Sequence, residues 1–179
     1  MGTAAIRRVP CSELGEPLLE ALSALYRAVW PFPVGSERPS RWAQEYLPQH
    51  AKLEGFRFLV ALISERIVAY SYGYPAREGQ WTSDQLLAAM GEGVRTEWMQ
   101  PPPFEVVTIA VDPDFQRQGI GSRLLTTLLA DLPHRRAVLW TESERQGALN
   151  FYAREGWTAI VPEAEIEGRS AVVLGKQMW

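Results

Sequence analysis

The feature that most constrains this chain is a glycine-containing loop at residues 116–122, which joins an apolar run to an amphipathic segment. The apolar run, residues 104–111, predicts a strand, and leucines at helical spacing predict a helix over residues 119–132. Consecutive backbone N–H groups can point outward where such a loop enters a helix. Together with the positive end of the helix dipole, they suit a pyrophosphate group. Glycine removes the Cβ atoms that would hold phosphate oxygens away.

Two other kinds of phosphate loop do not fit this sequence. The dinucleotide-binding fingerprint needs a third glycine where this chain has Leu124, and the Walker A loop needs a lysine where it has Ser122. A glycine turn that only starts a helix remains the alternative to a phosphate-binding loop.

The rest of the chain predicts a mixed α/β sheet in a single domain that covers residues 1–179. We expect strands at residues 4–9, 56–63, 67–74, 104–111, 137–141, 157–161 and 171–177, and helices at 17–29, 40–46, 119–132 and 144–155. Residues 76–103 interrupt this pattern as an insert with one short helix near residues 84–90. A long insert of this kind is often a lid or binding loop, and a surface excursion is the alternative.

The composition excludes several functional classes. Lys and Arg number 18 against 21 Asp and Glu, a net charge of −3, so the basic excess of a nucleic-acid-binding protein is absent. No apolar run approaches the ~20 residues that span a bilayer, and no signal-peptide pattern is present, so we expect a cytoplasmic protein without a membrane partner. One cysteine and two histidines far apart in sequence predict neither an internal disulfide nor a metal site.

Two linked motifs resemble those of the GNAT N-acetyltransferases. Residues 107–122 read VTIAVDPDFQRQGIGS, in which Gln116, Gly119 and Gly121 meet that family's Gln/Arg-x-x-Gly-x-Gly/Ala signature. Residues 148–157, ALNFYAREGW, resemble the family's helix that ends in Ala-x-x-x-Tyr-x-x-x-Gly-Phe. The resemblance implies the acyl-CoA N-acyltransferase fold, with a central, mostly antiparallel sheet that contains a splayed parallel strand pair and is flanked by helices.

The same resemblance implies acetyl-CoA as the cofactor and direct transfer of its acetyl group to a primary amine in a ternary complex. The strand beside the splay should pair with the pantetheine arm, and the loop should hold the pyrophosphate. The residues so implied are Ile109, Ala110, Val111, Gln116, Arg117, Gln118, Gly119, Ile120, Gly121 and Ser122. The alternatives are a non-catalytic acyl-CoA-binding regulatory module and a protein N-terminal or lysine acetyltransferase. Dimers are frequent in the family, so a homodimer is also expected.

Two residues are candidates for the chemistry. The resemblance places Tyr152 at the thioester sulfur as a proton donor, and an aromatic packing residue is the alternative. Glu105 lies six residues before Val111, where one branch of the family has its catalytic glutamate. A carboxylate in an apolar strand has a raised pKa, which suits a base acting through water, whereas an exposed strand start is the alternative. Many members carry the acid where this chain has Thr108, and often have asparagine where it has Arg145.

The acceptor site should be built from the first helices, the strand hairpin and the insert 76–103. Four aromatic residues in these segments are the candidates: Trp30, Tyr72, Trp81 and Trp98. Asp84, Glu92 and Glu97 of the insert would attract a cation. An aromatic, mildly acidic pocket favours a small-molecule amine, and an ordinary hydrophobic core with solvated acids is the alternative.

Overall fold

The computed structural model describes residues 3–178 and contains a seven-stranded mixed sheet in the order β1-β2-β3-β4-β5-β7-β6. The strands are β1 (Ala5–Arg8), β2 (Arg57–Ile63), β3 (Arg66–Pro75), β4 (Phe104–Val111), β5 (Arg136–Glu142), β6 (Thr158–Ile166) and β7 (Arg169–Gln177). Neighbours β1–β2, β2–β3, β5–β7 and β6–β7 pair antiparallel, and β4–β5 pairs parallel. The predicted mixed sheet with one parallel pair is confirmed.

Two compact units divide the chain. The first comprises residues up to Tyr74 and Thr108–Asp131, and the second comprises Pro75–Val107 and residues from Leu132 onward. Strand β4 contributes its C-terminal half to the first unit and its N-terminal half to the second. A single domain over residues 1–179 stays a prediction.

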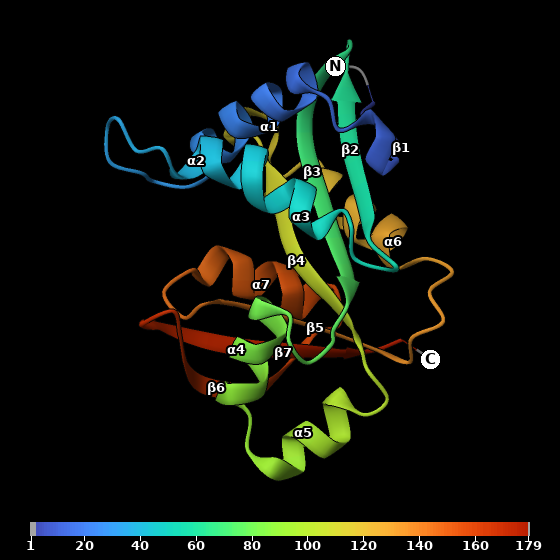
Figure 1. Ribbon diagram of the computed structural model, residues 1–179, viewed down its shortest axis with the longest axis vertical. Coiled ribbons are helices and arrows are strands. Elements are labelled where there is room, and N and C mark those ends of the chain that lie inside the picture. Colours follow the sequence, from blue (N-terminus) through green and yellow to red (C-terminus); the bar gives the residue numbers. More distant parts are fainter. Residues whose placement is uncertain (1–2, 179) are drawn as a thin grey trace. The chain divides into compact units, whose positions relative to one another are not determined.

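In the first unit, helices cover both faces of strands β1–β3. These helices are α1 (Glu16–Val29), α2 (Arg38–Arg41), α3 (Leu47–His50) and α6 (Ile120–Leu129), with a π-helical turn over Trp42–Tyr46 between α2 and α3. Figure 1 shows α1, α2 and α3 on the near face of these strands and α6 on the other. Leu22 and Leu25 are the buried residues of α1, as their helical spacing predicts.

The helix predicted at residues 40–46 is longer than expected. The chain stays helical from Arg38 to His50 and passes through Pro48, which the sequence predicts as its limit. Proline is tolerated in the first turn of a helix because it needs no N–H donor there, and Pro48 lies in the first turn of α3. The wider π-helical turn before it resets the hydrogen-bonding pattern.

In the second unit, the insert forms two helices, α4 (Trp81–Ala89) and α5 (Glu92–Met99), where one was expected. Helix α7 (Gln146–Arg154) completes the unit. The extended backbone of Met90 and Gly91 separates α4 from α5. A cluster of buried side chains fixes both helices on the sheet: Leu86, Met90, Trp98 and Met99 pack with Val138, Ile166, Ala171 and Val173. The insert is therefore a packed layer rather than a surface excursion.

Trp98 and Gly175 show how closely this layer lies on the sheet. Trp98 is 7% exposed, and a Cβ atom at Gly175 of β7 would lie 2.7 Å from ring carbons Cε3 and Cη2 of Trp98. Real Cβ atoms do not approach other atoms so closely. Only glycine therefore fits beneath the indole ring.

Candidate functional site

The turn before the glycine loop is fixed by Asp112 in the first unit. Its Oδ1 accepts a hydrogen bond from Asp114 N at 3.0 Å, and its Oδ2 accepts one from Arg66 Nη2 at 2.6 Å. Its backbone N–H donates to Val68 O of β3 at 2.8 Å. Arg66 also lies over the ring of Phe115, 5.3 Å from the centroid. Asp112 thus ties the end of β4 to β3 and sets the start of the loop.

The loop itself has a backbone that suits an anion. Arg117 and Gly119 have φ angles of +59° and +74°, and Gly119 is the N-cap of α6. Arg123 N donates to Gly119 O at 3.1 Å, so the amides of Ile120 and Gly121 precede the first bond within the helix and point out of its N-terminus. A Cβ at Gly119 would meet nothing within 4 Å. Glycine is needed at position 119 for its conformation rather than for lack of space.

The other expected cofactor residues differ in exposure. Gln116 Nε2 donates to Val111 O at 3.1 Å, which ties the loop back to β4. Ile109 and Val111 are half-buried, whereas Ala110 is 1% exposed and has only its backbone to offer. Gln118 is exposed and Ser122 is half-buried in the first turn of α6. The loop therefore fits a pyrophosphate through backbone amides, and acetyl-CoA as its ligand stays a prediction.

Glu105 is a buried carboxyl in the second unit. It is 1% exposed and lies opposite Val138 in the parallel register of β4 and β5. The alternative of an exposed strand start is wrong, because α4 covers this position. Ser83 of α4 donates its hydroxyl to Glu105 Oε2 at 2.7 Å. Burial raises the pKa of Glu105 to about 7, although hydrogen bonds from Ser83 and Thr82 oppose the rise.

Sequence reasoning missed Ser83 and Thr82. They are more than twenty positions away from Glu105 in sequence, and hydroxyl residues in a first helical turn usually cap the helix instead. Only the packing of α4 on the sheet brings them to the carboxyl.

Tyr152 lies on α7 in the same unit as Glu105. Its ring is half-buried and contacts Phe151 and Trp157, with centroids 5.1 Å and 5.8 Å away. Burial raises the pKa of its phenol, so the hydroxyl keeps its proton at physiological pH. The ring contacts agree with the packing alternative and leave the hydroxyl's role in catalysis a prediction.

Arg145, which stands where the family often has asparagine, is held by an acid. Its Nε donates to Glu142 Oε2 at 3.0 Å, and Arg169 Nη1 donates to Oε1 of the same carboxylate at 2.5 Å. Burial would raise the pKa of Glu142, but the hydrogen bonds and charges of the two arginines outweigh it and lower that pKa. Glu142 therefore holds Arg145 at the N-terminus of α7.

Trp30 and Tyr72, two of the candidate acceptor residues, belong to an aromatic cluster in the first unit. Tyr26 stacks on Trp42, with centroids 4.6 Å apart, and contacts Trp30 at the same distance. Tyr72 is 1% exposed, and its hydroxyl contacts Trp42 Nε1 at 3.4 Å and His50 Nδ1 at 3.2 Å. Burial lowers the pKa of His50, so its imidazole is neutral at physiological pH.

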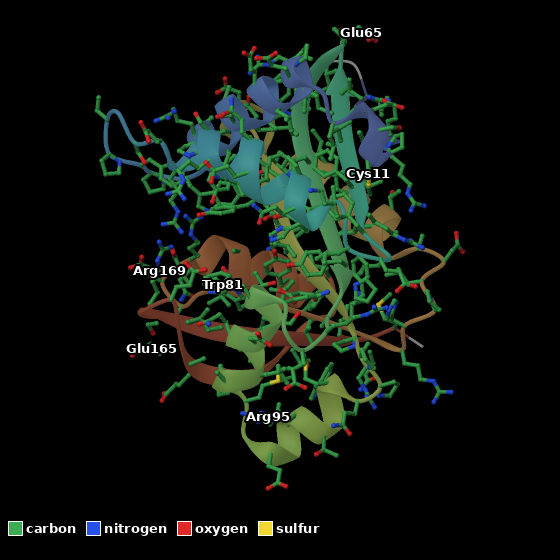
Figure 2. All side chains as sticks on the ribbon, viewed as in Figure 1. Cys11, Glu65, Trp81, Arg95, Glu165 and Arg169 are labelled. Carbon is green, nitrogen blue, oxygen red and sulfur yellow. The ribbon has the colours of Figure 1, made fainter. Side chains whose placement is uncertain are left out.

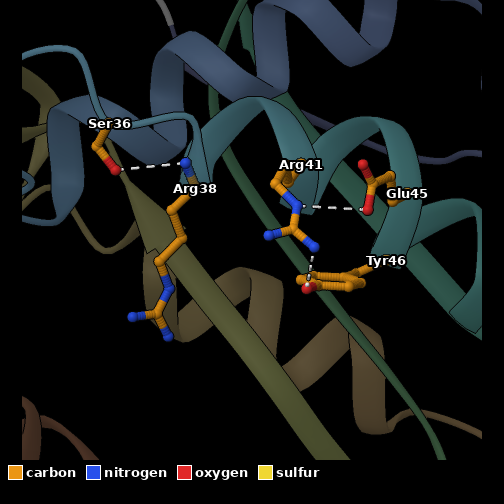
Figure 3. A network of polar contacts seen from close by, with 5 residues as sticks. All are labelled: Ser36, Arg38, Arg41, Glu45 and Tyr46. Carbon is orange, nitrogen blue, oxygen red and sulfur yellow. Dashed lines mark hydrogen bonds and ion pairs between the residues drawn. The ribbon is translucent and has the colours of Figure 1, made fainter.

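Polar side chains lie on the exposed side of the helical segment that carries Trp42. Arg41 Nε donates to Glu45 Oε2 at 3.5 Å and its Nη2 to Tyr46 Oη at 3.2 Å, while Arg38 N donates to Ser36 Oγ at 3.3 Å (Figure 3). Arg41 and Glu45 therefore place charge on the exposed side, whereas Trp42 packs against Tyr70 and Tyr72 of β3.

Trp81 and Trp98, the other two candidates, differ sharply in exposure. Trp81 is 59% exposed and begins α4, where Figure 2 labels it. Trp98 belongs to α5, is 7% exposed and packs in the core against β7. Of the insert's acids, Asp84 accepts a hydrogen bond from Gly79 N at 2.9 Å, and Glu92 and Glu97 are exposed.

Residues 3–178 hold no group of three or more His, Cys, Asp or Glu side chains placed to bind a metal ion. Within the same residues, no helix has the length and apolar character needed to cross a membrane.

Comparison with known proteins identifies the family. Residues 19–157 match the model of the Acetyltransferase (GNAT) family. A curated relative, the GCN5-like protein acetyltransferase Rv2170 of Mycobacterium tuberculosis, is 26% identical over 121 residues, or 63% of this chain, and the chain spans 59% of the relative's length.

Two crystal structures share the fold. PH1933 from Pyrococcus horikoshii OT3 has 23% identity and a TM-score of 0.70. The PaiA N-acetyltransferase from Thermoplasma acidophilum, in complex with coenzyme A, has 13% identity and a TM-score of 0.63. Each match covers 98% of this chain and 99% of the other. Since the family model extends from within α1 to just beyond the end of α7, the chain belongs to the acetyltransferase (GNAT) family.

Proposed function

We propose that this protein transfers the acetyl group of acetyl-CoA to the primary amine of a small molecule by direct attack in a ternary complex. The observation that carries the proposal is the buried carboxyl of Glu105, whose pKa of about 7 suits it to accept a proton near neutral pH. A regulatory module that only binds acyl-CoA has no use for such a group. The presence of Glu105 therefore favours a catalytic function over acyl-CoA binding alone.

The loop before α6 supports acetyl-CoA as the acetyl donor. Backbone amides of Gln118–Ser122 at the helix N-terminus would hold the pyrophosphate, with Arg117 adding positive charge. The amides and carbonyls of Ile109–Val111 would pair with the pantetheine arm if β4 splays from β5 as expected. A structural neighbour was crystallised with coenzyme A, which agrees with this assignment.

Glu105 and Tyr152 would handle the two protons of the reaction. An aliphatic amine has a pKa near 10.4 and must lose a proton before its lone pair can attack the thioester carbonyl. Glu105 would accept that proton through a water. As the nitrogen–carbon bond forms and the carbon–sulfur bond breaks, the Tyr152 hydroxyl would donate a proton to the departing sulfur, and the phenolate would regain one from the nitrogen, which loses its second proton to become an amide.

The acceptor class rests on aromatic and acidic residues. Of the four predicted substrate residues, Trp81 is 59% exposed and Trp30 is half-buried, so these two are the proposed contacts with the acceptor, whereas Tyr72 and Trp98 are buried. An exposed indole and the exposed acids Glu92 and Glu97 of the same insert would favour a cationic, amine-bearing small molecule. The curated relative is described as a protein acetyltransferase, which makes a protein acceptor the second candidate.

A thiol-release screen tests the function. Purified protein with acetyl-CoA is challenged with a panel of small primary amines and with peptides that carry either a lysine or a free N-terminus. Thiol release that depends on a small amine supports the proposal, and release only with peptides favours the protein acceptor. Absence of release with every acceptor, while acetyl-CoA still binds, would leave the regulatory module. Light scattering on the same sample tests the expected homodimer.

A further inference from the structure

Glu105 is the end of a short hydrogen-bonded chain that reaches from the buried strand to the surface of α4. Ser83 Oγ lies 2.7 Å from Glu105 Oε2 and 3.1 Å from Gln80 Oε1. Ser83 is 0% exposed and Glu105 1% exposed, whereas Gln80 is half-buried. Bulk water therefore does not reach the serine hydroxyl or the carboxyl in this arrangement.

The single proton of the Ser83 hydroxyl cannot be donated to Gln80 Oε1 and Glu105 Oε2 at the same time. A hydroxyl has one proton to donate, and both the amide oxygen of Gln80 and an ionised Glu105 are acceptors only. Ser83 can therefore donate to one of them at a time. The second contact becomes a hydrogen bond only when Glu105 carries a proton of its own.

Each protonation state of Glu105 has a complete arrangement. When Glu105 is ionised, Ser83 donates to the carboxylate, and Gln80 Oε1 still accepts from Arg77 N at 3.0 Å. When Glu105 is protonated, it donates to Ser83 Oγ, and Ser83 turns its proton to Gln80 Oε1. Rotation of one hydroxyl thus gives Ser83 and Glu105 a hydrogen-bond partner in both states, which avoids the penalty of leaving either of them unpaired.

The surroundings make this hydroxyl the main polar influence on the carboxyl. Thr82, from the same turn of α4, supplies the other hydrogen bond to Glu105. Asp84 of α4 is turned to Gly79 N, 2.9 Å away. On β5, Arg136 lies two residues before Val138 and so shares the face of Glu105, but its Nη1 donates to Gln100 O at 3.0 Å. No ion pair joins Glu105 to a charged group among the described residues.

We propose that Ser83 is a positioning residue for Glu105, donating to the carboxylate when Glu105 is ionised and to Gln80 when Glu105 is protonated. The catalytic consequence rests on the proposed role of Glu105 as the base. In that role, the carboxyl gains and loses a proton in every turnover. Rotation of the Ser83 hydroxyl keeps both Ser83 and Glu105 hydrogen-bonded in either state.

The proposal predicts opposite effects for the two partners of Ser83. Ser83→Ala weakens the ionised state more than the protonated state, because hydrogen bonds to charged groups are the stronger ones, so the pKa of Glu105 rises. Gln80→Met removes the oxygen to which Ser83 donates only when Glu105 is protonated, whereas the bond from Arg77 N is lost equally in both states, so the pKa of Glu105 falls. Each change should move the titration by about one pH unit. A serine that only packs or caps the helix would not produce shifts of opposite sign.

Infrared titration of the protonated carboxyl band tests this directly, with Glu105→Gln used to assign the band. Ser83→Thr retains a hydroxyl and should restore the wild-type titration. Thr96→Ala, which removes an exposed hydroxyl that donates to Glu92 O within α5, should leave it unchanged. Shifts in the same direction for Ser83→Ala and Gln80→Met, or no shift in either, overturn the proposal.

The pH profile of acetyl transfer separates this proposal from the proposed function. If Glu105 is the base, the acid limb of kcat/KM moves with the infrared titration in each variant. If the infrared titration shifts in opposite directions but the acid limb stays in place, the role of Ser83 stands and Glu105 is not the base.

Discussion

At the scale of single residues, the environment of Glu105 links function to stability. The pKa of this carboxyl is about 7 in the folded chain against 4.5 for an unperturbed glutamate, because burial disfavours the charged form. The folded chain therefore binds a proton that the unfolded chain has already released between these values. Its free energy of unfolding falls as pH rises from about 4.5 to about 7, by about 3 kcal/mol once Glu105 is fully ionised.

Glu105→Gln should remove the loss of stability that ionisation of Glu105 causes. We expect its free energy of unfolding to exceed that of the wild type by up to about 3 kcal/mol at pH 8 and to differ little at pH 5. Acetyl transfer should fall sharply, since the amide cannot accept a proton. Urea unfolding at both pH values measures the effect, with Glu97→Gln, an exposed acid of α5, as the matched control. The same change in stability at both pH values would contradict the assignment.

Tyr152→Phe tests the second proposed group. The phenylalanine ring keeps the contacts with Phe151 and Trp157, so the melting temperature and the affinity for acetyl-CoA should change little. Loss of the proton donor should lower kcat by about 10²-fold. Tyr46→Phe, which removes a hydroxyl that accepts from Arg41, is the control and should retain full turnover. An unchanged kcat for Tyr152→Phe would show that the tyrosine only packs.

At the scale of secondary-structure elements, the sequence predicts local features well and long-range packing poorly. The strand at residues 104–111 has the predicted bounds, and the hairpin of β2 and β3 was visible in its two apolar runs. The insert was predicted with one short helix, but its second helix and the packing of both on the sheet were not, because the side chains that stabilise α4 and α5 come from β5, β6 and β7, far along the chain. For the same reason, the apolar spacing around Glu105 could indicate a raised pKa but could not reveal Ser83.

The contact of α5 with β7 can be tested by a double-mutant cycle. Trp98→Ala should lower the free energy of unfolding by about 3–5 kcal/mol because it leaves a cavity. Gly175→Ala should lower it by about 1–3 kcal/mol because its methyl group meets the indole ring. In the Trp98→Ala background, the methyl group enters the cavity, so the second substitution should cost little. Additive losses would mean that the two residues do not touch in solution.

The control for this cycle is Gly147→Ala on α7. A Cβ at Gly147 would meet nothing within 4 Å, and alanine favours a helix more than glycine does. We therefore expect a small gain in stability from that substitution.

At the scale of the whole molecule, the features that the sequence resemblance singled out are distributed over both units. The loop that enters α6 belongs to the first unit, and Glu105 and Tyr152 belong to the second. A net charge of −3 without a basic excess agrees with the proposed cationic acceptor. Ligand binding to the folded chain is the property that reports on the molecule as a whole.

Acetyl-CoA should raise the melting temperature of the wild-type protein, because a ligand that binds only the folded state stabilises it by about 2.7 kcal/mol at a hundred times its Kd. Gly121→Trp should abolish the shift, since its side chain would occupy the space before the helix N-terminus. Gly93→Trp is the matched control: both glycines are the second residue of a helix, and Gly93 of α5 is exposed with open space around it. Its melting temperature should still rise with acetyl-CoA. A shift that survives in Gly121→Trp would exclude the loop as the binding site, because no pyrophosphate could reach its amides past the indole ring.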